Sequence, residues 1–234
     1  MRTGGARVRR SRTLAFGAVL LGLVISYVLA VSVRGRLGTS LVLVAQIGTV
    51  GLALRAAHAH RVIRGVAAAA MGLAAVAAVA SLASAGDGAQ GAAFFAASFL
   101  YFVAPLSLLR WIVRRGEVDL QTFLAAISAY IMIGMFFAFV YRAVSYIQAG
   151  SFFGVNGEGT NSQTLFFSFT TLTTTGYGNL VPAGNPGQTL AVLEMLMGQL
   201  FLVTAVAKVI TAWKPAKWGI DKESETAVTD PPKE

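Results

Sequence analysis

Residues 161–182 read NSQTLFFSFTTLTTTGYGNLVP, and this stretch decides the fold. Thr160 and Gln163 have the spacing of a capping box, which predicts that a helix begins here. About a dozen residues up to Thr173 would make a helix about 18 Å long, roughly half a membrane. Such a helix cannot cross the hydrocarbon core. It must stop inside and return, which requires a backbone that is buried in protein or lines water.

The rest of the chain is apolar enough to surround such a turn with membrane helices. Of the 234 residues, 56% are hydrophobic and 12% are charged, about half the charged fraction of a soluble domain. A helix of about 20 apolar residues crosses a hydrocarbon core. We expect six such helices, at the apolar stretches Leu14–Val33, Leu41–Leu54, Val66–Ala85, Ala92–Val113, Leu120–Ile147 and Gln188–Ala212. The second stretch is the shortest, and its helix is expected to begin a little earlier, near Leu37.

The predicted fold is therefore an all-α membrane protein with six transmembrane helices. The short apolar stretch Thr164–Leu172 would re-enter between the last two. Residues 1–115 would hold the four N-terminal transmembrane helices, and residues 116–214 a helix–loop–helix module that contains the quoted stretch. Residues 215–234 are polar, with paired prolines, which predicts a disordered tail.

The basic residues predict the orientation of these helices. If six segments span and the short one re-enters, sixteen of the nineteen Lys and Arg residues lie on one side, and only Arg34, Arg36 and Arg142 lie on the other. The positive-inside rule then places both termini in the cytoplasm of a multi-pass plasma-membrane protein. The net charge of +9 is spread in short clusters between apolar runs, so no nucleic-acid partner is expected.

Enzymatic chemistry has no candidate residues in this sequence. The chain contains no cysteine, which excludes disulfides, thiolate catalysis and cysteine metal sites. His58 and His60 have no convergent Asp or Glu partners, so we predict no metal site there. No pairing of a nucleophile with a base is visible, and we expect no enzyme.

Residues Thr173–Gly178 read TTTGYG, a pattern with a specific backbone geometry. Two glycines flanking a tyrosine suit a backbone that alternates between positive and negative φ, since glycine adopts positive φ at little cost. This alternation would aim successive carbonyl oxygens at one axis. Four such strands around that axis would form rings of oxygens able to replace the water shell of a potassium ion.

An outer helix, the sequence FSFTTLTTTGYGNLVP and an inner helix together resemble the pore module of prokaryotic potassium channels, over Leu120–Ala212. The resemblance implies a homotetramer in a lipid bilayer that conducts potassium passively, with no cofactor besides the permeant K⁺ ions. It implies a selectivity filter at Thr174–Gly178. Carbonyl oxygens of Thr174, Thr175, Gly176 and Tyr177, with the Thr174 hydroxyl, would coordinate the ions, and Gly178 would complete the filter.

The sequence departs from the family pattern in three places. Thr175 stands where Val or Ile is common, which places a hydroxyl where an apolar group normally packs. Asn179 replaces the usual Asp and removes four negative charges from the outer mouth of a tetramer. Phe166 and Phe167 replace aromatics with hydrogen-bonding ends, so Tyr177 would lack its customary partner.

These departures leave mixed sodium and potassium permeation as an alternative. A potassium transporter is a second alternative, but it would need several pore repeats in one chain, and this chain has one GYG.

Two residues of the last apolar stretch are candidates for gating and filter support. Gly198 lies twenty residues beyond Gly178, where the family's inner helix has its hinge glycine; close helix packing is the alternative. Glu194 is the one acidic residue inside a predicted span, and its burial would be costly without partners. We expect it to support the filter from behind the pore helix through Thr170 or Thr171, together with Asn179 at the mouth. Direct contact with ions is the alternative.

Further along this stretch, Gln199 is predicted to face the cavity below the filter. Leu202, Val206 and Ile210 follow at helical spacing and would continue that face toward the cytoplasm. Ordinary helix–helix packing explains their spacing equally well.

We predict that voltage has little effect on opening. Arg55, His58, Arg61 and Arg64 repeat every third residue, but they straddle a predicted cytoplasmic loop, and the fourth apolar stretch carries no charge before Arg110. One charge moving through 100 mV supplies about 2.3 kcal/mol, and steep gating uses about three to four charges per subunit. Open probability measured against voltage should be nearly flat. A steep curve that flattens on neutralising the three arginines from 55 to 64 would contradict this.

Overall fold

A computed structural model describes residues 3–32, 35–57, 61–83, 87–114 and 119–212. The described chain is helical and contains no strand, which confirms the all-α prediction. Its elements are α1 (Thr3–Ser32), α2 (Gly35–Ala56), α3 (Arg61–Ala83), α4 (Asp87–Val113), α5 (Leu120–Ile147), the 3₁₀ turn η1 (Gly154–Asn156), α6 (Asn161–Leu172) and α7 (Asn185–Ala212). The histidines at 58 and 60 and the tail 215–234 lie outside the described residues.

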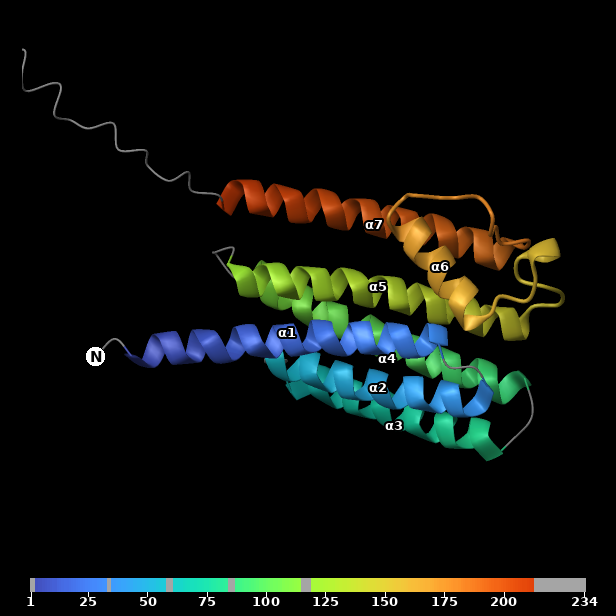
Figure 1. Ribbon diagram of the computed structural model, residues 1–234, viewed down its shortest axis with the longest axis horizontal. Coiled ribbons are helices and arrows are strands. Elements are labelled where there is room, and N and C mark those ends of the chain that lie inside the picture. Colours follow the sequence, from blue (N-terminus) through green and yellow to red (C-terminus); the bar gives the residue numbers. More distant parts are fainter. Residues whose placement is uncertain (1–2, 33–34, 58–60, 84–86, 115–118, 213–234) are drawn as a thin grey trace, which may run out of the picture.

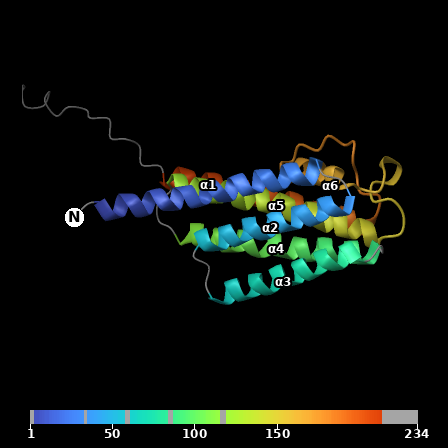
Figure 2. The same ribbon diagram turned by 60° about the horizontal axis from the view of Figure 1, so that its bottom comes forward.

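The long helices lie roughly side by side along one axis, and the short α6 lies between α5 and α7 at one end (Figures 1 and 2). Helices α1 to α4 form a bundle, and α4 packs along α5. Helix α5 is therefore the shared wall between the N-terminal bundle and the α6–α7 unit. Helix α1 reaches past α5 to touch α6, where the rings of Tyr27 and Phe169 meet edge to face at 5.7 Å.

The helix bounds differ from the predicted stretches mainly at polar ends. Helix α5 has the predicted bounds. Helix α7 begins at Asn185, three residues earlier than predicted, because Pro186 suits the first turn of a helix. Arg55 lies in the last turn of α2, and Arg61 and Arg64 lie in the first turn of α3, so these arginines lie on either side of a connection between helices, as the sequence predicts.

Four helices of the described chain contain an apolar stretch long enough to cross a membrane. These stretches are Leu14–Ser32, Phe94–Val113, Leu120–Ile147 and Asn185–Ala205. Helices α2 and α3 contain the shorter apolar stretches Val44–Ala56 and Ile63–Val76. Much of α3 is alanine, which contributes less hydropathy than larger apolar residues. The count of six spans therefore stays a prediction.

Close approach between helices depends on small residues at two points. A Cβ added to Gly22 of α1 would lie 2.8 Å from Oγ1 of Thr49 on α2. A Cβ added to Gly134 of α5 would lie 2.8 Å from the ring of Phe169 on α6. The second contact matters more for the site, since it sets how close the short helix lies to α5.

We predict that Gly134→Ala loosens α6. Its methyl group would overlap a ring that is also held by Tyr27, so the contact cannot relax freely, and overpacking of this kind costs about 1–3 kcal/mol. The thermal unfolding midpoint of the purified protein should fall. Gly48→Ala in α2 is the control, since nothing lies within 4 Å of its added Cβ, and it should be neutral or slightly stabilising. Equal midpoints for the two variants would show that the Gly134 contact is not tight.

Candidate functional site

The start of α6 is fixed by the predicted capping box. The Thr160 backbone N–H donates to Oε1 of Gln163 at 2.9 Å, and the Gln163 N–H donates back to Oγ1 of Thr160 at 3.3 Å. The helix then runs for 12 residues. At 1.5 Å per residue its length is about 18 Å, as expected from the sequence.

Arg142 of α5 holds the loop that leads into α6. Its guanidinium donates to the Gly159 carbonyl at 2.7 Å and to Oδ1 of Asn161 at 3.0 Å. It also lies over the ring of Tyr146, 4.3 Å from the centroid. Sequence reasoning counted Arg142 only as a basic residue on the outer side. Its position inside an apolar stretch was a signal that it has fixed partners.

A second link joins this loop to the far end of the TTTGYG segment. Gln163 donates through Nε2 to the Asn156 carbonyl at 3.2 Å, and Asn156 donates through Nδ2 to the Asn179 carbonyl at 2.9 Å. The predicted support residue Asn179 is thus held through its backbone. The capping residue of α6 and the residue after the glycines share one hydrogen-bond network.

After α6 the chain turns back over the C-terminal end of the helix. The N–H groups of Thr175 and Gly176 both donate to the Thr170 carbonyl, at 2.8 and 3.2 Å, and the Thr174 N–H donates to the Thr171 carbonyl at 3.0 Å. Terminal carbonyls of a helix have no partner within the helix. Here the following segment supplies the partners, so the turn and the helix end stabilise each other.

The backbone of this turn has positive φ at every second residue. Gly176 and Gly178 have φ of 53° and 77°, which confirms the expected alternation, and Thr174 has φ of 58°. Thr174 is the one non-glycine with positive φ among the described residues. Such a conformation costs an L-residue about 1–2 kcal/mol, and strain held in place by surrounding structure is typical of functional sites.

The side chains of the turn have partners at two positions where the sequence departs from the family pattern. The Thr175 hydroxyl, expected where an apolar group packs, pairs with the Thr173 hydroxyl at 2.9 Å. Tyr177 does have an aromatic partner: its ring stacks on Phe166 with centroids 5.7 Å apart. Phe167 is instead buried against Tyr141, at 5.0 Å between centroids. Phe166 thus supports Tyr177 by ring contact rather than by a hydrogen bond.

Glu194 is fully buried behind α6, but its partners are not the threonines predicted from the sequence. Its carboxyl accepts a hydrogen bond from the Tyr141 hydroxyl at 2.7 Å and is also bonded to the Ser168 hydroxyl. The hydroxyl of Thr170 bonds within its own helix, to the Phe167 carbonyl. The expectation of Thr170 or Thr171 is corrected to Ser168, because Glu194 meets α6 two or three residues earlier than expected.

The hydrogens of this cluster can be counted. The Ser168 hydroxyl has one hydrogen, and two acceptors lie within reach: the Gly134 carbonyl at 2.7 Å and Glu194. A protonated Glu194 would donate to Ser168, leaving the serine hydrogen for Gly134 and one carboxyl oxygen for Tyr141. A neutral carboxyl therefore satisfies every group in the cluster and ties α5, α6 and α7 together.

Gly198 is the point of closest approach between α7 and α6. A Cβ here would collide with the carbonyl oxygen of Leu172, the last residue of α6. The same carbonyl accepts from the Tyr130 hydroxyl at 3.1 Å. Close packing explains the glycine, and α7 runs through this position as one helix. The hinge role stays a prediction.

Of the four residues predicted to line the cavity, the structure describes the side chains of Gln199 and Leu202. Gln199 and Leu202 are both exposed on α7. Leu202 lines an apolar groove between α7 and helices α4 and α5. The side chains at 206 and 210 lie outside the described part of the chain, so the predictions for Val206 and Ile210 are not tested.

Two long apolar helices that flank a short helix and a tightly held turn are the parts of an ion-channel module. Residues 128–214 match a family model described as an ion channel. The chain is also similar to the inward rectifier potassium channel Kirbac3.1 of Paramagnetospirillum magnetotacticum, with 31% identity over 88 residues. No solved structure gives a significant match.

The similarity covers 38% of this chain and 30% of that relative, so the chain spans less than a third of the relative's length. Within these bounds, both matches confirm the resemblance to the prokaryotic potassium channel family. The chain carries an ion-channel domain, and it lies in a membrane.

Glu194→Gln should be mild, because an amide can donate to Ser168 and accept from Tyr141 as a neutral carboxyl does. Glu194→Leu should leave the buried Tyr141 hydroxyl unpaired, which costs about 1–3 kcal/mol per group. Thermal unfolding should show a drop only for Leu. Met195→Leu, at the exposed neighbouring position, is the control.

Single-channel recordings of the same variants distinguish two roles for Glu194, structural support of α6 and direct contact with ions. Structural support predicts near-normal conductance for Glu194→Gln. Equal, large losses of conductance for Gln and Leu would show instead that Glu194 touches the permeating ions.

Proposed function

We propose that four copies of this chain form a potassium-selective channel that conducts K⁺ passively across the plasma membrane. The observation that carries the proposal is the alternation of φ at Thr174, Gly176 and Gly178. A backbone with this alternation turns successive carbonyls toward one side, and rings of such carbonyls replace the hydration shell of K⁺. The matched ion-channel domain includes all three residues.

The ion ligands would be the carbonyl oxygens of Thr174, Thr175, Gly176 and Tyr177, with the Thr174 hydroxyl. These residues are exposed on the single chain. The carbonyl oxygens of one chain reach an ion from one side only. Further copies of the chain around the axis are therefore needed to surround the ion. Four copies give the geometry of the filter described for potassium channels.

The surface of α7 supports assembly of several copies. In the first half of the helix, the buried residues form one narrow stripe, at Gly187, Ala191, Glu194 and Gly198, and this stripe faces α5 and α6. Large apolar side chains point elsewhere, and Leu200 and Val203 are 66% and 59% exposed. A helix with this pattern has room for neighbouring copies of itself beside a central pore and for lipid outside.

The proposed topology has six spans, with α6 re-entering from the outer side and both termini in the cytoplasm. Helix α6 has half the length needed to cross, and its following turn satisfies its last carbonyls within the protein. This is the condition for a non-helical backbone at membrane depth. Helices α2 and α3 have 22 and 23 residues, about 33–35 Å at 1.5 Å per residue, enough for a span.

Selectivity is tested by bi-ionic recordings from the purified chain in planar bilayers. The reversal potential should lie near the potassium equilibrium value. A permeability ratio near one would remove selectivity and favour the mixed sodium and potassium channel that the Thr175 and Asn179 departures leave open.

Gly176→Ala tests the geometry of the proposed filter. The added Cβ of alanine has space within the chain, but the φ of 53° at this position strains any residue other than glycine, and each subunit of the assembly carries this strain. Conduction should be lost while the assembly keeps its size by light scattering. Normal conduction by this variant would contradict the proposed filter.

A further inference from the structure

An apolar groove of about 360 Å³ lies between α2 and α3. Most of its wall consists of apolar side chains and two glycines, at Ile47, Gly48, Gly51, Leu52, Leu54 and Met71. Two arginines, Arg55 and Arg64, form the rest of the wall. The volume is within the range of small-molecule sites, about 300–1,000 Å³.

The groove is open because α2 carries glycine at positions 48 and 51. These positions are three residues apart and so lie on one face of the helix. A Cβ added at either glycine would meet nothing within 4 Å. Thr49, by contrast, is buried, and its hydroxyl would lie 2.8 Å from a Cβ added to Gly22 of α1. Helix α2 is therefore tightly packed against α1 and leaves space next to α3.

Both arginines lie at the same end of the groove. Arg55 is in the last turn of α2, and Arg64 is in the first turn of α3. Ile47 and Met71 stand eight and seven residues away along these helices, about 10–12 Å at 1.5 Å per residue. The groove therefore has one end with two positive charges and a longer part that is apolar.

The guanidinium groups of Arg55 and Arg64 are available to a ligand. Both side chains are exposed, and neither guanidinium has a hydrogen-bond or ion-pair partner among the residues that the structure describes. The sequence contains no Asp or Glu before Asp87, so α2 and α3 have no carboxylate of their own. Arginine presents its N–H donors as a planar fork that binds phosphate through two parallel hydrogen bonds. Two such forks at one end of a groove suit a single phosphate group.

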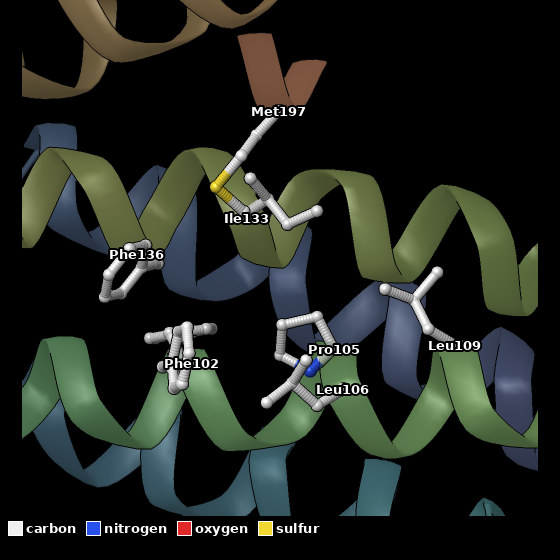
Figure 3. A pocket seen from close by; sticks show the side chains of 8 residues that line it. Phe102, Pro105, Leu106, Leu109, Ile133, Phe136 and Met197 are labelled. Atoms are coloured by element: carbon white, nitrogen blue, oxygen red, sulfur yellow. The ribbon is translucent and has the colours of Figure 1, made fainter. Parts of the chain in front are cut away.

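A second apolar space, between α4, α5 and α7, has no such charged end (Figure 3). Met197 of α7 reaches toward Ile133 of α5, while Phe102 and Pro105 approach from α4. This pocket is about 40 Å³ in volume, and its lining includes no charged side chain. It has no room for an acyl chain, so the α2–α3 groove is the better candidate for an amphipathic ligand.

We propose that the α2–α3 groove binds an anionic phospholipid, with the phosphate at Arg55 and Arg64 and one acyl chain over Gly48 and Gly51. A phospholipid supplies both parts of the match in one molecule, whereas free phosphate would leave the apolar part of the groove empty. A second copy of the chain would have to bring a carboxylate to the arginines, and residues 1–86 contain none. The proposal rests on the proposed topology, which places this end of α2 and α3 at the cytoplasmic leaflet, but not on potassium selectivity.

Binding is tested without ion flux, so that it can fail independently of the channel proposal. Dioleoyl phosphatidylglycerol should raise the thermal unfolding midpoint of the full chain in neutral detergent in a saturable way, since ligands that bind only the native state stabilise it. Dioleoyl phosphatidylcholine has the same chains and no net charge, and it should bind more weakly. Inorganic phosphate at the same concentration should give no shift. Arg55→Gln and Arg64→Gln should each raise the half-saturating concentration of phosphatidylglycerol about tenfold.

Two matched variants control for charge and bulk. Arg110→Gln removes an exposed arginine from the last turn of α4, outside the groove, and should bind phosphatidylglycerol as the native chain does. Gly48→Phe should fill the groove and abolish the shift. Gly72→Phe introduces the same side chain at an exposed position of α3 outside the groove, with nothing within 4 Å of its Cβ, and should keep the shift.

Amide hydrogen exchange locates the bound lipid within the chain. Helices α2 and α3 contain the shorter apolar stretches Val44–Ala56 and Ile63–Val76, and a lipid between them would add apolar contacts to this pair. Phosphatidylglycerol should therefore slow exchange more in α2 and α3 than in α5, because local opening of these two helices becomes less frequent. Equal slowing in all three helices would contradict the proposed site.

Equal binding of phosphatidylglycerol and phosphatidylcholine would overturn the role of the two arginines. Equal losses in Arg110→Gln and in the two groove variants, or full binding by Gly48→Phe, would overturn the site. A shift with inorganic phosphate as large as that with phosphatidylglycerol would show that the arginines bind a free anion and would contradict the proposed lipid.

Discussion

The end of α6 has to bond its last carbonyls without help from a following helix turn, and the rest of the site depends on this constraint. The chain meets it by folding back, so that Thr170 accepts from two successive N–H groups. The fold-back forces positive φ on Thr174, a residue that disfavours it. A strained turn persists only if its surroundings hold it. Tyr130 on the Leu172 carbonyl and Asn156 on the Asn179 carbonyl hold its two ends.

The surroundings are held in turn by contacts that need small or buried polar residues. Gly134 and Gly198 let α5 and α7 approach α6 so closely that a methyl group would collide at either position. At this distance Glu194, Ser168 and Tyr141 form one buried cluster. Removing water from such a cluster is costly unless every group is paired. The cluster therefore fixes the positions of α5, α6 and α7 along one another. Apolar contacts alone are not directional and would allow the helices to slide.

Local patterns allowed the sequence to predict the helical class, the bounds of α5, the capping box and the positive φ of both glycines. Contacts between distant residues were not predictable in this way. The partner of Glu194 depends on the relative height of two helices, and a shift of two or three residues along α6 exchanges Thr170 or Thr171 for Ser168. The positive φ of Thr174 contradicts its own preference and is set by the fold-back. The contacts of Arg142 with Gly159 and Asn161 are an exception, because a charge inside an apolar stretch is visible in the sequence and indicates that it has fixed partners.

The N-terminal bundle touches the channel domain at two levels, and this decides what it can influence. Beside the turn, Tyr27 of α1 packs on Phe169, whose ring also lies against Gly134. This contact is packed and leaves little freedom. Near the other end of α7, Lys208 donates to the Ile112 carbonyl of α4 at 2.9 Å, beside an apolar groove. The contact beside the turn is tightly packed, whereas an apolar groove lies between the last part of α7 and helices α4 and α5. The part of α7 beyond Gly198 is therefore the part of the ion-channel domain that the N-terminal bundle holds less closely.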